Sequence, residues 1–188
     1  MFNTDQAHIG EYARASAENT ARVVEFVLTS IQRHFQYVKP IMLREKTVAK
    51  MPNIQKGIDW AYEHADKLYA ACFTPGLTSA ERLILLTACP GLGLPKAGFV
   101  LQLCTGAVGC MDVHNLRRFG LKASTFSTSS KTSAQLLHKK AQLYVDTCER
   151  MGGSAYLWDS WCQLIADKYP RVWRDAEHVS NEHANCFV

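Results

Sequence analysis

The sequence contains no long apolar run, and this absence excludes one class of protein. No stretch approaches the ~20 apolar residues that a membrane-spanning helix requires. The first residues also lack the charged and then apolar segments that are typical of a signal sequence. We therefore expect a protein that is cytoplasmic and does not bind membranes.

The seven cysteines include no CxxC pair and no repeated spacing. Most of them lie within apolar runs, which predicts buried free thiols in a reducing compartment. The histidines likewise occur without the HExxH or CxxC context that is typical of zinc sites. We predict no metal site.

Alternation of apolar and polar residues, the pattern of a half-buried strand, is missing over any useful length, and no internal repeat occurs. Apolar residues recur instead at helical spacing, which predicts an all-α chain. Residues 1–16 are small and polar, and we expect a loose N-terminal arm there. Helices are predicted for the following ranges: 17–38, 54–72, 78–86, 95–103, 132–151 and 154–169, with a further helix opening at the polar cluster after Cys110.

The composition is that of an ordinary globular domain, with 188 residues, 47% hydrophobic and 20% charged. This length is sufficient for one domain with a substantial core, so we treat residues 1–188 as a single domain. The net charge of +4 is a mild basic bias. Such a bias is compatible with a nucleic-acid partner without identifying one.

The segment 78–121 organises the rest of the chain. Thr78 and Glu81 have capping-box spacing, which places a helix start before an apolar run. The sequence Cys89-Pro90-Gly91-Leu92-Gly93-Leu94 then breaks this helix, because glycines permit a sharp reversal. Pro95 suits the first turn of a second helix. We also expect a second capping box from Thr132 and Gln135.

A helix, a glycine turn and a second helix leave backbone N–H groups unpaired at a helix N-terminus. The helix dipole is positive there, and the site therefore receives a phosphate oxygen without a charged side chain. A turn between two buried helices with no ligand is the alternative interpretation of the same residues.

Two sequences in this segment resemble one known family. PGLGLPKAGFVLQL looks like the helix-hairpin-helix of the DNA glycosylase superfamily, and CMDVHNLRRFGL looks like that family's segment with the essential aspartate. The resemblance implies a compact two-lobed helical fold in which Gly91, Leu92 and Gly93 contact the backbone of double-stranded DNA. It also implies that Asp112 acts on an extruded nucleotide.

Many members of this family hold an iron–sulfur cluster with four closely spaced C-terminal cysteines. Cys148, Cys162 and Cys186 cannot supply that pattern. We therefore predict neither a cluster nor any other cofactor.

Asp112 is the main catalytic candidate, although an aspartate at a helix start also serves as a plain N-cap. His114 fits three roles: it orients Asp112, acts as a base, or packs in the core. Asn115 lies three residues after Asp112, on nearly the same helix face, where it faces either the carboxylate or a substrate base.

Some members of the family use a lysine just after the second hairpin glycine as a nucleophile. Here Pro95 takes that position, and Lys96 lies one residue beyond it. One residue rotates a helical side chain by roughly 100°. We keep Lys96 as a catalytic candidate, but a phosphate contact or a solvated position suits it equally well.

Arg117, Arg118 and Lys122, with Lys131 in the Ser/Thr-rich loop over residues 122–131, form a basic patch beside these residues. Contact with DNA phosphate is one interpretation, and a solvated surface is the other. We expect the loop to be flexible before anything binds it.

The details of the two motifs are most similar to a phage branch of the superfamily, the α-glutamyl/putrescinyl thymine pyrophosphorylases or amino acid:DNA transferases. The resemblance implies that an amino acid or polyamine displaces pyrophosphate from a modified thymine in DNA, in the cytoplasm of the host cell. Asp112 or His114 would serve as the base, and Lys96, Arg117 or Arg118 as donors. A monofunctional DNA glycosylase and a non-catalytic DNA-binding module are the alternatives.

Overall fold

The computed structural model describes residues 2–30, 52–129 and 131–159, and all the regular structure in these ranges is helical. The predicted all-α class is therefore confirmed. The predicted helical residues 31–38 and 160–169 lie outside the described residues. The helices are α1 (Phe2–Ala15), α2 (Ala17–Ser30), α4 (Pro52–Glu63), α5 (Ala65–Phe73), α6 (Ser79–Leu86), α7 (Leu94–Thr105), α8 (Val113–Arg118) and α9 (Ala134–Arg150), and residues 153–159 are also helical.

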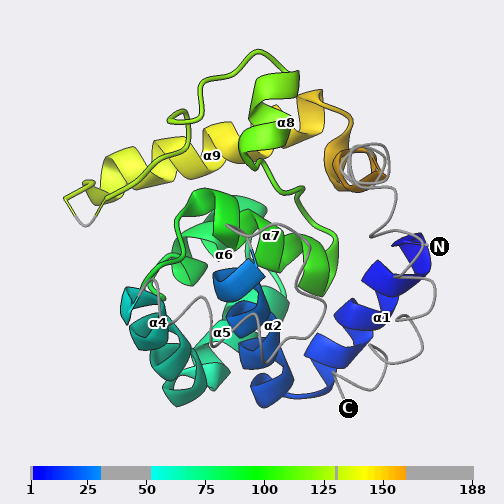
Figure 1. The fold of residues 1–188 in the computed structure, drawn as a ribbon, viewed down its shortest axis with the longest axis vertical. Coiled ribbons are helices and arrows are strands. Elements are labelled where there is room, and N and C mark those ends of the chain that lie inside the picture. The colour runs from blue at the N-terminus through cyan, green and yellow to red at the C-terminus, as the bar shows by residue number, and fades with distance from the viewer. Residues whose placement is uncertain (1, 31–51, 130, 160–188) are drawn as a thin grey trace.

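Helix α7 lies at the centre of the molecule, in contact with α1, α2, α5 and α6 (Figure 1). Its side chains are buried around the whole helix from Ala97 to Cys104, as expected for a helix that is apolar on every face. Figure 1 shows α2, α4 and α5 below α7, with α8 and α9 above it. The long loop that follows α7 crosses between these two groups of helices.

The expectation of a loose arm over residues 1–16 is wrong, because α1 occupies most of that range. Ala13 is fully buried, and Gly10 packs so closely on α7 that a Cβ there would lie 3.2 Å from the Cys104 carbonyl oxygen. Ile9, Tyr12 and Ala13 form a narrow apolar stripe at helical spacing. The polar composition of the segment conceals this stripe.

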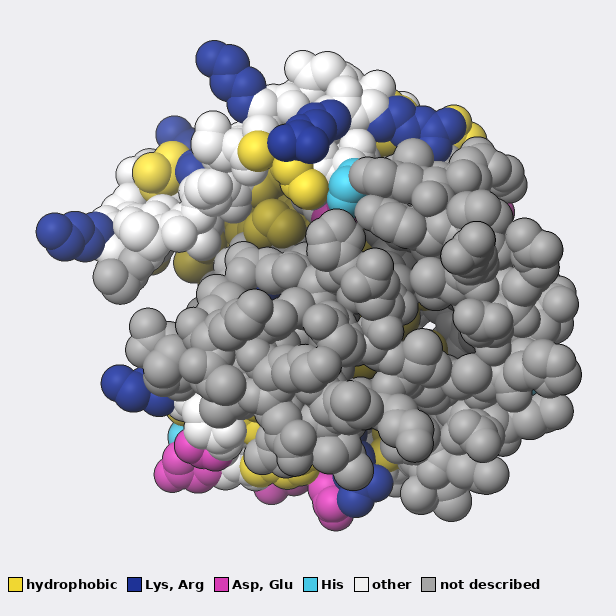
Figure 2. Space-filling view, in the orientation of Figure 1, with side chains coloured by type: hydrophobic (Ala, Val, Ile, Leu, Met, Phe, Trp, Pro, Cys, Tyr) yellow, Lys and Arg dark blue, Asp and Glu magenta, His cyan; other side chains and the backbone are white. Residues whose placement is uncertain are grey.

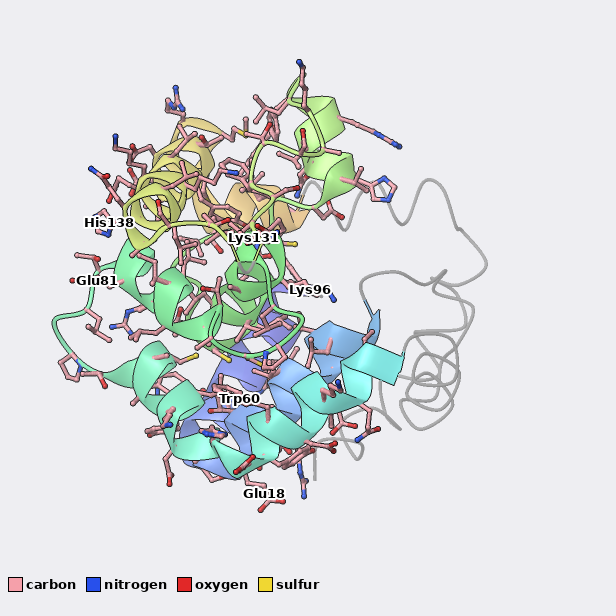
Figure 3. The ribbon with its side chains drawn as sticks, turned by 90° about the vertical axis from the view of Figure 1, so that its left-hand side faces the viewer. Glu18, Trp60, Glu81, Lys96, Lys131 and His138 are labelled. Carbon is pink, nitrogen blue, oxygen red and sulfur yellow. The ribbon has the colours of Figure 1, made fainter. Side chains whose placement is uncertain are left out.

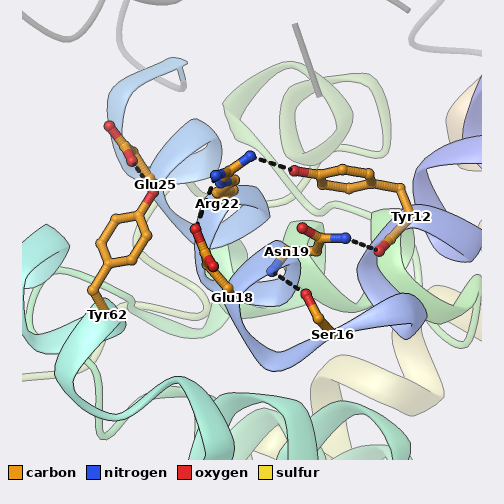
Figure 4. A network of polar contacts seen from close by, with 7 residues as sticks. All are labelled: Tyr12, Ser16, Glu18, Asn19, Arg22, Glu25 and Tyr62. Carbon is orange, nitrogen blue, oxygen red and sulfur yellow. Dashed lines mark hydrogen bonds and ion pairs between the residues drawn. The ribbon is translucent and has the colours of Figure 1, made fainter. Parts of the chain in front are cut away.

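Polar contacts join α1, α2 and α4 at one edge of the molecule (Figure 4). The side-chain amide of Asn19 donates to the Tyr12 carbonyl at 2.9 Å, and Arg22 donates to the Tyr12 hydroxyl at 3.3 Å. Tyr62 in α4 donates to the carboxylate of Glu25 in α2 at 2.6 Å. These contacts fix the corner between the first two helices and tie α4 to it.

The predicted helix over residues 54–72 is in fact two helices, with a break at His64. This residue has φ −118° and ψ 32°, outside the helical region, and it precedes α5. Its ring stacks on Trp60, with the ring centroids 4.4 Å apart. The apolar spacing continues across the break, so periodicity alone does not reveal it.

The capping box at the start of α6 is confirmed. The Thr78 hydroxyl accepts a hydrogen bond from the Glu81 N–H at 3.2 Å, and the Glu81 carboxylate accepts one from the Thr78 N–H at 2.7 Å. These hydrogen bonds from Thr78 lower the pKa of the Glu81 carboxyl.

The second predicted capping box, from Thr132 and Gln135, is wrong by one residue. Ser133 caps α9 and accepts from the Leu136 N–H at 3.3 Å. The Thr132 hydroxyl instead accepts from the Ser129 N–H at 2.9 Å, which closes a turn just before the helix. The Thr132 hydroxyl therefore bonds within this local turn and does not cap the helix as the spacing predicts.

The five cysteines in the described ranges are free, and Cys72, Cys89, Cys104 and Cys148 are buried as predicted, whereas Cys110 is partly exposed. Cys162 and Cys186 lie outside these ranges. None of the described helices combines the length and the hydropathy that a bilayer span requires.

Candidate functional site

The predicted turn between α6 and α7 is present, but only one of its two glycines has the positive φ that the sequence predicts for both. Gly91 has φ +85°, a conformation that favours glycine, and the Leu92 N–H donates to the Cys89 carbonyl at 3.1 Å to close the turn. Gly93 is extended and precedes α7, and Pro95 lies in the first turn of that helix. Leu92 is buried, and only 4% of it is exposed.

Several backbone N–H groups around this turn have no partner. Those of Gly91, Gly93, Leu94 and Lys96 donate to no acceptor in the described part of the chain, and Pro95 has no N–H to donate. Gly91 is exposed, and Gly93 and Lys96 are partly exposed. These donors lie at the positive end of α7, which is the arrangement that accepts an anion.

Lys96 leaves α7 on the side away from Glu81 and His138 (Figure 3). Burial lowers the pKa of its ammonium group, and the thiol of Cys89 is its neighbour. Burial also raises the pKa of Cys89 to about 12, so this thiol is neutral. No carboxylate in the described ranges forms a salt bridge with Lys96. Its charge is therefore available to an anion near the hairpin.

Asp112 is the N-cap of α8, which is the structural role that the sequence offers as the alternative to a catalytic one. One carboxylate oxygen accepts a hydrogen bond from the Asn115 N–H at 2.8 Å. Among the described residues, this is the only hydrogen bond of that carboxylate. Asp112 is half-buried, and its second oxygen remains available to a ligand. The cap and a catalytic role are therefore compatible.

Asn115 and His114 differ in their surroundings. Asn115 is only 3% exposed, and its side-chain amide donates to the Cys110 carbonyl at 2.7 Å. The Asn115 side chain therefore holds the backbone that precedes Asp112. Only the backbone N–H of Asn115 bonds to the Asp112 carboxylate. His114 is half-buried and hydrogen-bonds no other residue in the part of the chain that is described.

The segment that precedes Asp112, Gly109–Met111, is held by the hydroxyl of Tyr144. This hydroxyl donates to the Gly109 carbonyl at 2.9 Å and accepts from the Met111 N–H at 2.8 Å. Tyr144 belongs to α9 and reaches this position over Gly98 of α7, where a Cβ would lie 2.1 Å from the hydroxyl oxygen. Only glycine at position 98 leaves room for this tyrosine.

Two further side chains hold the same segment. Gln102 of α7 accepts from the Cys110 N–H at 2.9 Å and donates to the Ser154 carbonyl at 3.0 Å. The sulfur of Cys148 in α9 accepts from the Gly109 N–H at 3.0 Å. With the bonds of Tyr144 and Asn115, these contacts pair five backbone groups of the segment with four side chains.

Cys110 connects this segment to the hairpin. Its sulfur lies 3.8 Å from the Pro95 carbonyl oxygen in the first turn of α7. Burial, with the negative charge of Asp112 adding to it, raises the pKa of the Cys110 thiol well above its ordinary value. The capped aspartate and the unpaired donors of the hairpin therefore belong to neighbouring parts of one structure.

Sequence reasoning did not assign Gln102, Tyr144 or Cys148 to the site. Tyr144 and Cys148 belong to a regular apolar stripe and carry no separate signal. Gln102 does carry one, because it is a polar residue within an otherwise apolar helix. Such a residue must find hydrogen-bond partners when it is buried, and Gln102 is 1% exposed.

A basic surface covers the part of the chain that follows Asp112. Between Val113 and Lys140 the sequence contains no Asp or Glu. Figure 2 shows most of the Lys and Arg side chains on the upper side of the molecule, which α8, α9 and the loop between them form. The segment contains these basic residues: Arg117, Arg118, Lys122, Lys131, Lys139 and Lys140. All but Lys140 are exposed.

The Ser/Thr-rich loop between α8 and α9 is irregular, as predicted. Lys140 donates to the Ser127 carbonyl. The Thr128 hydroxyl lies beside the hairpin, 3.7 Å from the position of a Cβ on Gly93. The loop therefore lies against the glycine turn at Thr128. Its predicted flexibility stays a prediction.

The fold defines an all-α protein whose central helix begins at a glycine turn. No protein-family model matches the chain, and neither a curated protein nor a solved structure matches it. The resemblance of segment 78–121 to the glycosylase superfamily therefore stays a prediction. In the described ranges, no group of three or more His, Cys, Asp or Glu side chains is arranged to hold a metal ion.

Proposed function

We propose that this protein modifies thymine-derived bases in DNA, displacing pyrophosphate from a 5-pyrophosphoryloxymethyl group with an amine. One observation carries the proposal: unpaired backbone N–H groups at the start of α7 lie next to the segment that ends in Asp112. The link between them is the 3.8 Å contact of Cys110 with Pro95. The choice of this reaction within the family comes from the sequence resemblance.

The proposed contacts with DNA divide into two groups. Gly91, Gly93 and Lys96 offer N–H groups, and Lys96 also offers its ammonium group, to one backbone phosphate. Arg117 and Lys122 lie on an exposed surface without carboxylates in the same segment, which supports further phosphate contacts. Contacts of this kind position the duplex without identifying its sequence.

The reaction is a substitution at the exocyclic carbon of the base. The amine nitrogen forms a bond to that carbon, and the carbon–oxygen bond to pyrophosphate breaks, so that pyrophosphate leaves with the electron pair. The amine proton passes to Asp112, whose second carboxylate oxygen is available, or to His114. Lys96, Arg117 or Arg118 would neutralise the charge of the leaving pyrophosphate.

A DNA glycosylase is the second candidate, because the same available carboxylate oxygen suits the activation of water. A non-catalytic binding module is the third. Its support is the hydrogen bond from Asn115 to Asp112, since a residue that caps a helix has a structural use without any chemistry. The three candidates share the hairpin and differ in what happens to the base.

The deciding experiment is mass spectrometry of nucleosides after incubation of the protein with two duplexes. One contains pyrophosphorylated 5-hydroxymethyluracil and is supplied with amino acids and polyamines; the other carries common damaged bases. A heavier nucleoside with release of pyrophosphate supports the transferase and identifies the amine. Free base with abasic sites contradicts the transferase and supports a glycosylase.

The variant Asp112→Asn separates chemistry from binding. Asparagine caps helices as well as aspartate does, so the fold should persist. If the variant loses all product formation but binds DNA as tightly as the wild type, the binding module is excluded. If neither duplex yields a product with the wild-type protein, the proposed reaction fails and the binding module takes its place.

A further inference from the structure

We infer that Tyr144 is the positioning residue for Asp112, acting through the backbone of Gly109–Met111. This inference rests on the proposed function for its catalytic consequence. Tyr144 lies in α9, 32 residues after Asp112 in the sequence, and its hydroxyl forms its hydrogen bonds to Gly109 and Met111 and not to the hairpin turn. Its hydroxyl forms hydrogen bonds on both sides of Cys110, at 2.9 Å to Gly109 and 2.8 Å to Met111.

The hydroxyl has a fixed direction of donation. It donates to the Gly109 carbonyl and accepts from the Met111 N–H, so both of its hydrogen-bonding functions are used. Tyr144 is fully buried, and its ring packs edge-on against Phe126 with the centroids 4.8 Å apart. Burial raises the pKa of the phenol well above its ordinary value, which keeps the donor protonated.

The position of Asp112 follows from that of Met111, the residue directly before it. Met111 is fully buried, and its N–H is fixed by Tyr144. Asp112 is also tied to α8 by two bonds, from Asn115 N–H to its carboxylate and from Leu116 N–H to its carbonyl at 2.9 Å. A shift at Met111 would therefore move the carboxylate and the start of α8 together.

The site has room for the tyrosine only because residue 98 is glycine. A Cβ at that position would lie 2.1 Å from the hydroxyl oxygen and 2.6 Å from the ring carbon that carries it. Gly98 lies within α7, where glycine costs stability relative to alanine. This cost at a helix interior is explained by the close approach of Tyr144.

The test compares Tyr144→Phe with the matched control Tyr69→Phe. Tyr69 also donates its hydroxyl to a backbone carbonyl, that of Arg14 at 3.1 Å, but in an exposed position remote from this segment. For each variant we would measure the single-turnover rate, KM, DNA affinity, and backbone hydrogen exchange at Gly109, Cys110 and Met111. Thermal unfolding identifies a variant that merely fails to fold.

We expect Tyr144→Phe to lower the single-turnover rate on the order of 10²-fold, the effect of a displacement of about 1 Å at a reacting group. KM and DNA affinity should stay within twofold of the wild type, and exchange should accelerate at Met111. Tyr69→Phe should change none of these. An unchanged rate in a folded Tyr144→Phe protein overturns the inference.

A second variant acts on the hydroxyl without removing it. Gly98→Ala places a methyl group against Tyr144 and should lower the rate at unchanged DNA affinity, as Tyr144→Phe does. Full activity of folded Gly98→Ala also overturns the inference, because the added methyl group cannot be accommodated with the Tyr144 hydroxyl in place.

The failure of the proposed function would look different. If the wild type forms no product from either duplex, the chemistry fails, and the exchange data alone decide about Tyr144. Exchange that stays slow at Met111 in Tyr144→Phe overturns the positioning role. Faster exchange confined to Gly109–Met111 and α8 supports it.

Discussion

Gly57 in α4 lies directly against the carbonyl of Pro90 in the hairpin turn. A Cβ on residue 57 would stand 2.3 Å from that oxygen, closer than any ordinary contact. The Cys89 thiol contacts the Gly57 carbonyl at 3.5 Å from the other direction. The turn that would receive DNA is therefore supported from beneath by a helix more than thirty residues earlier in the chain.

Gly57→Ala should destabilise the protein. Alanine in a helix interior gains about 0.5–1 kcal/mol over glycine. The clash with Pro90 costs about 1–3 kcal/mol when the backbone must move. We expect the clash to dominate, with a lower Tm in thermal unfolding and weaker DNA binding. A rise in Tm would show that the turn moves away without cost.

Gly93→Ala and Gly91→Ala should separate the binding role of the turn from its folding. Gly93 has φ −82°, and a Cβ there makes only ordinary contacts, the nearest at 3.7 Å. Alanine loses part of the cap preference and gains backbone rigidity, each about 0.5–1 kcal/mol, so the stability should hardly change. DNA affinity should fall about tenfold at every sequence, or about 1.4 kcal/mol, because the methyl group keeps phosphate from the backbone.

Gly91→Ala is the opposite case. At φ +85° an alanine costs about 1–2 kcal/mol, and its Cβ would also lie 3.3 Å from Leu28. Denaturant unfolding should show this loss. If Gly93→Ala binds DNA of any sequence as tightly as the wild type, the hairpin is not the phosphate site.

Substitutions of Asp112 should separate its contribution to stability from its contribution to activity. Asparagine and aspartate cap helices equally well, whereas alanine costs about 1 kcal/mol at such a position. We expect Asp112→Asn to unfold with the wild type and Asp112→Ala to unfold about 2–4 °C lower. Both should be inactive. Activity in Asp112→Asn would exclude the carboxylate from the chemistry.

Gln102→Leu should destabilise the protein more than its size suggests. The partly buried Cys110 N–H would lose its acceptor and the partly buried Ser154 carbonyl its donor. An unsatisfied buried group costs about 1–3 kcal/mol, and we expect a total loss of about 2 kcal/mol by denaturant unfolding. Gln142→Leu is the matched control, because Gln142 is exposed and, among the described residues, hydrogen-bonds only Asp146. Equal losses for the two variants would contradict this account.

The Glu81 carboxyl should make stability depend on pH in a defined direction. The folded protein holds its pKa below the ordinary value of 4.5 through hydrogen bonds from Thr78. A lowered folded pKa contributes stability above the unfolded pKa, and this contribution is lost as the pH falls through the folded value. Tm should therefore be higher in the wild type than in Glu81→Gln at pH 7, and the difference should vanish in acid. A constant difference would contradict the linkage.

The sequence predicts those parts of the fold that local patterns control. The Thr78–Glu81 capping box and the glycine turn are local, and both are present. The sequence does not predict α1, because the apolar stripe of this helix is narrow. It does not predict the break at His64 either, because the apolar spacing continues across the break. In these cases tertiary packing decides what a local pattern leaves open.

The candidate site divides in the same way. Asp112 and the hairpin glycines are found in one short segment, so sequence motifs locate them. Tyr144 and Gln102 act through contacts 33 and 8 residues away in the sequence, at Met111 and Cys110. The spacing of apolar residues does not predict which backbone group a buried hydroxyl will hydrogen-bond. Such partners become visible only in three dimensions.

The contacts around Gly109–Met111 also set an order for biosynthesis. The hairpin turn has contacts with Leu28 of α2 and Gly57 of α4, which precede it in the chain, so these contacts can form once α7 has left the ribosome. Asp112 is synthesised shortly afterwards, yet three of the five paired backbone groups before it find their partners only when Tyr144 and Cys148 of α9 arrive. Under the proposed function, a nascent chain would acquire the turn proposed to bind phosphate before the Asp112 carboxylate is in place, and would bind DNA before it could modify it.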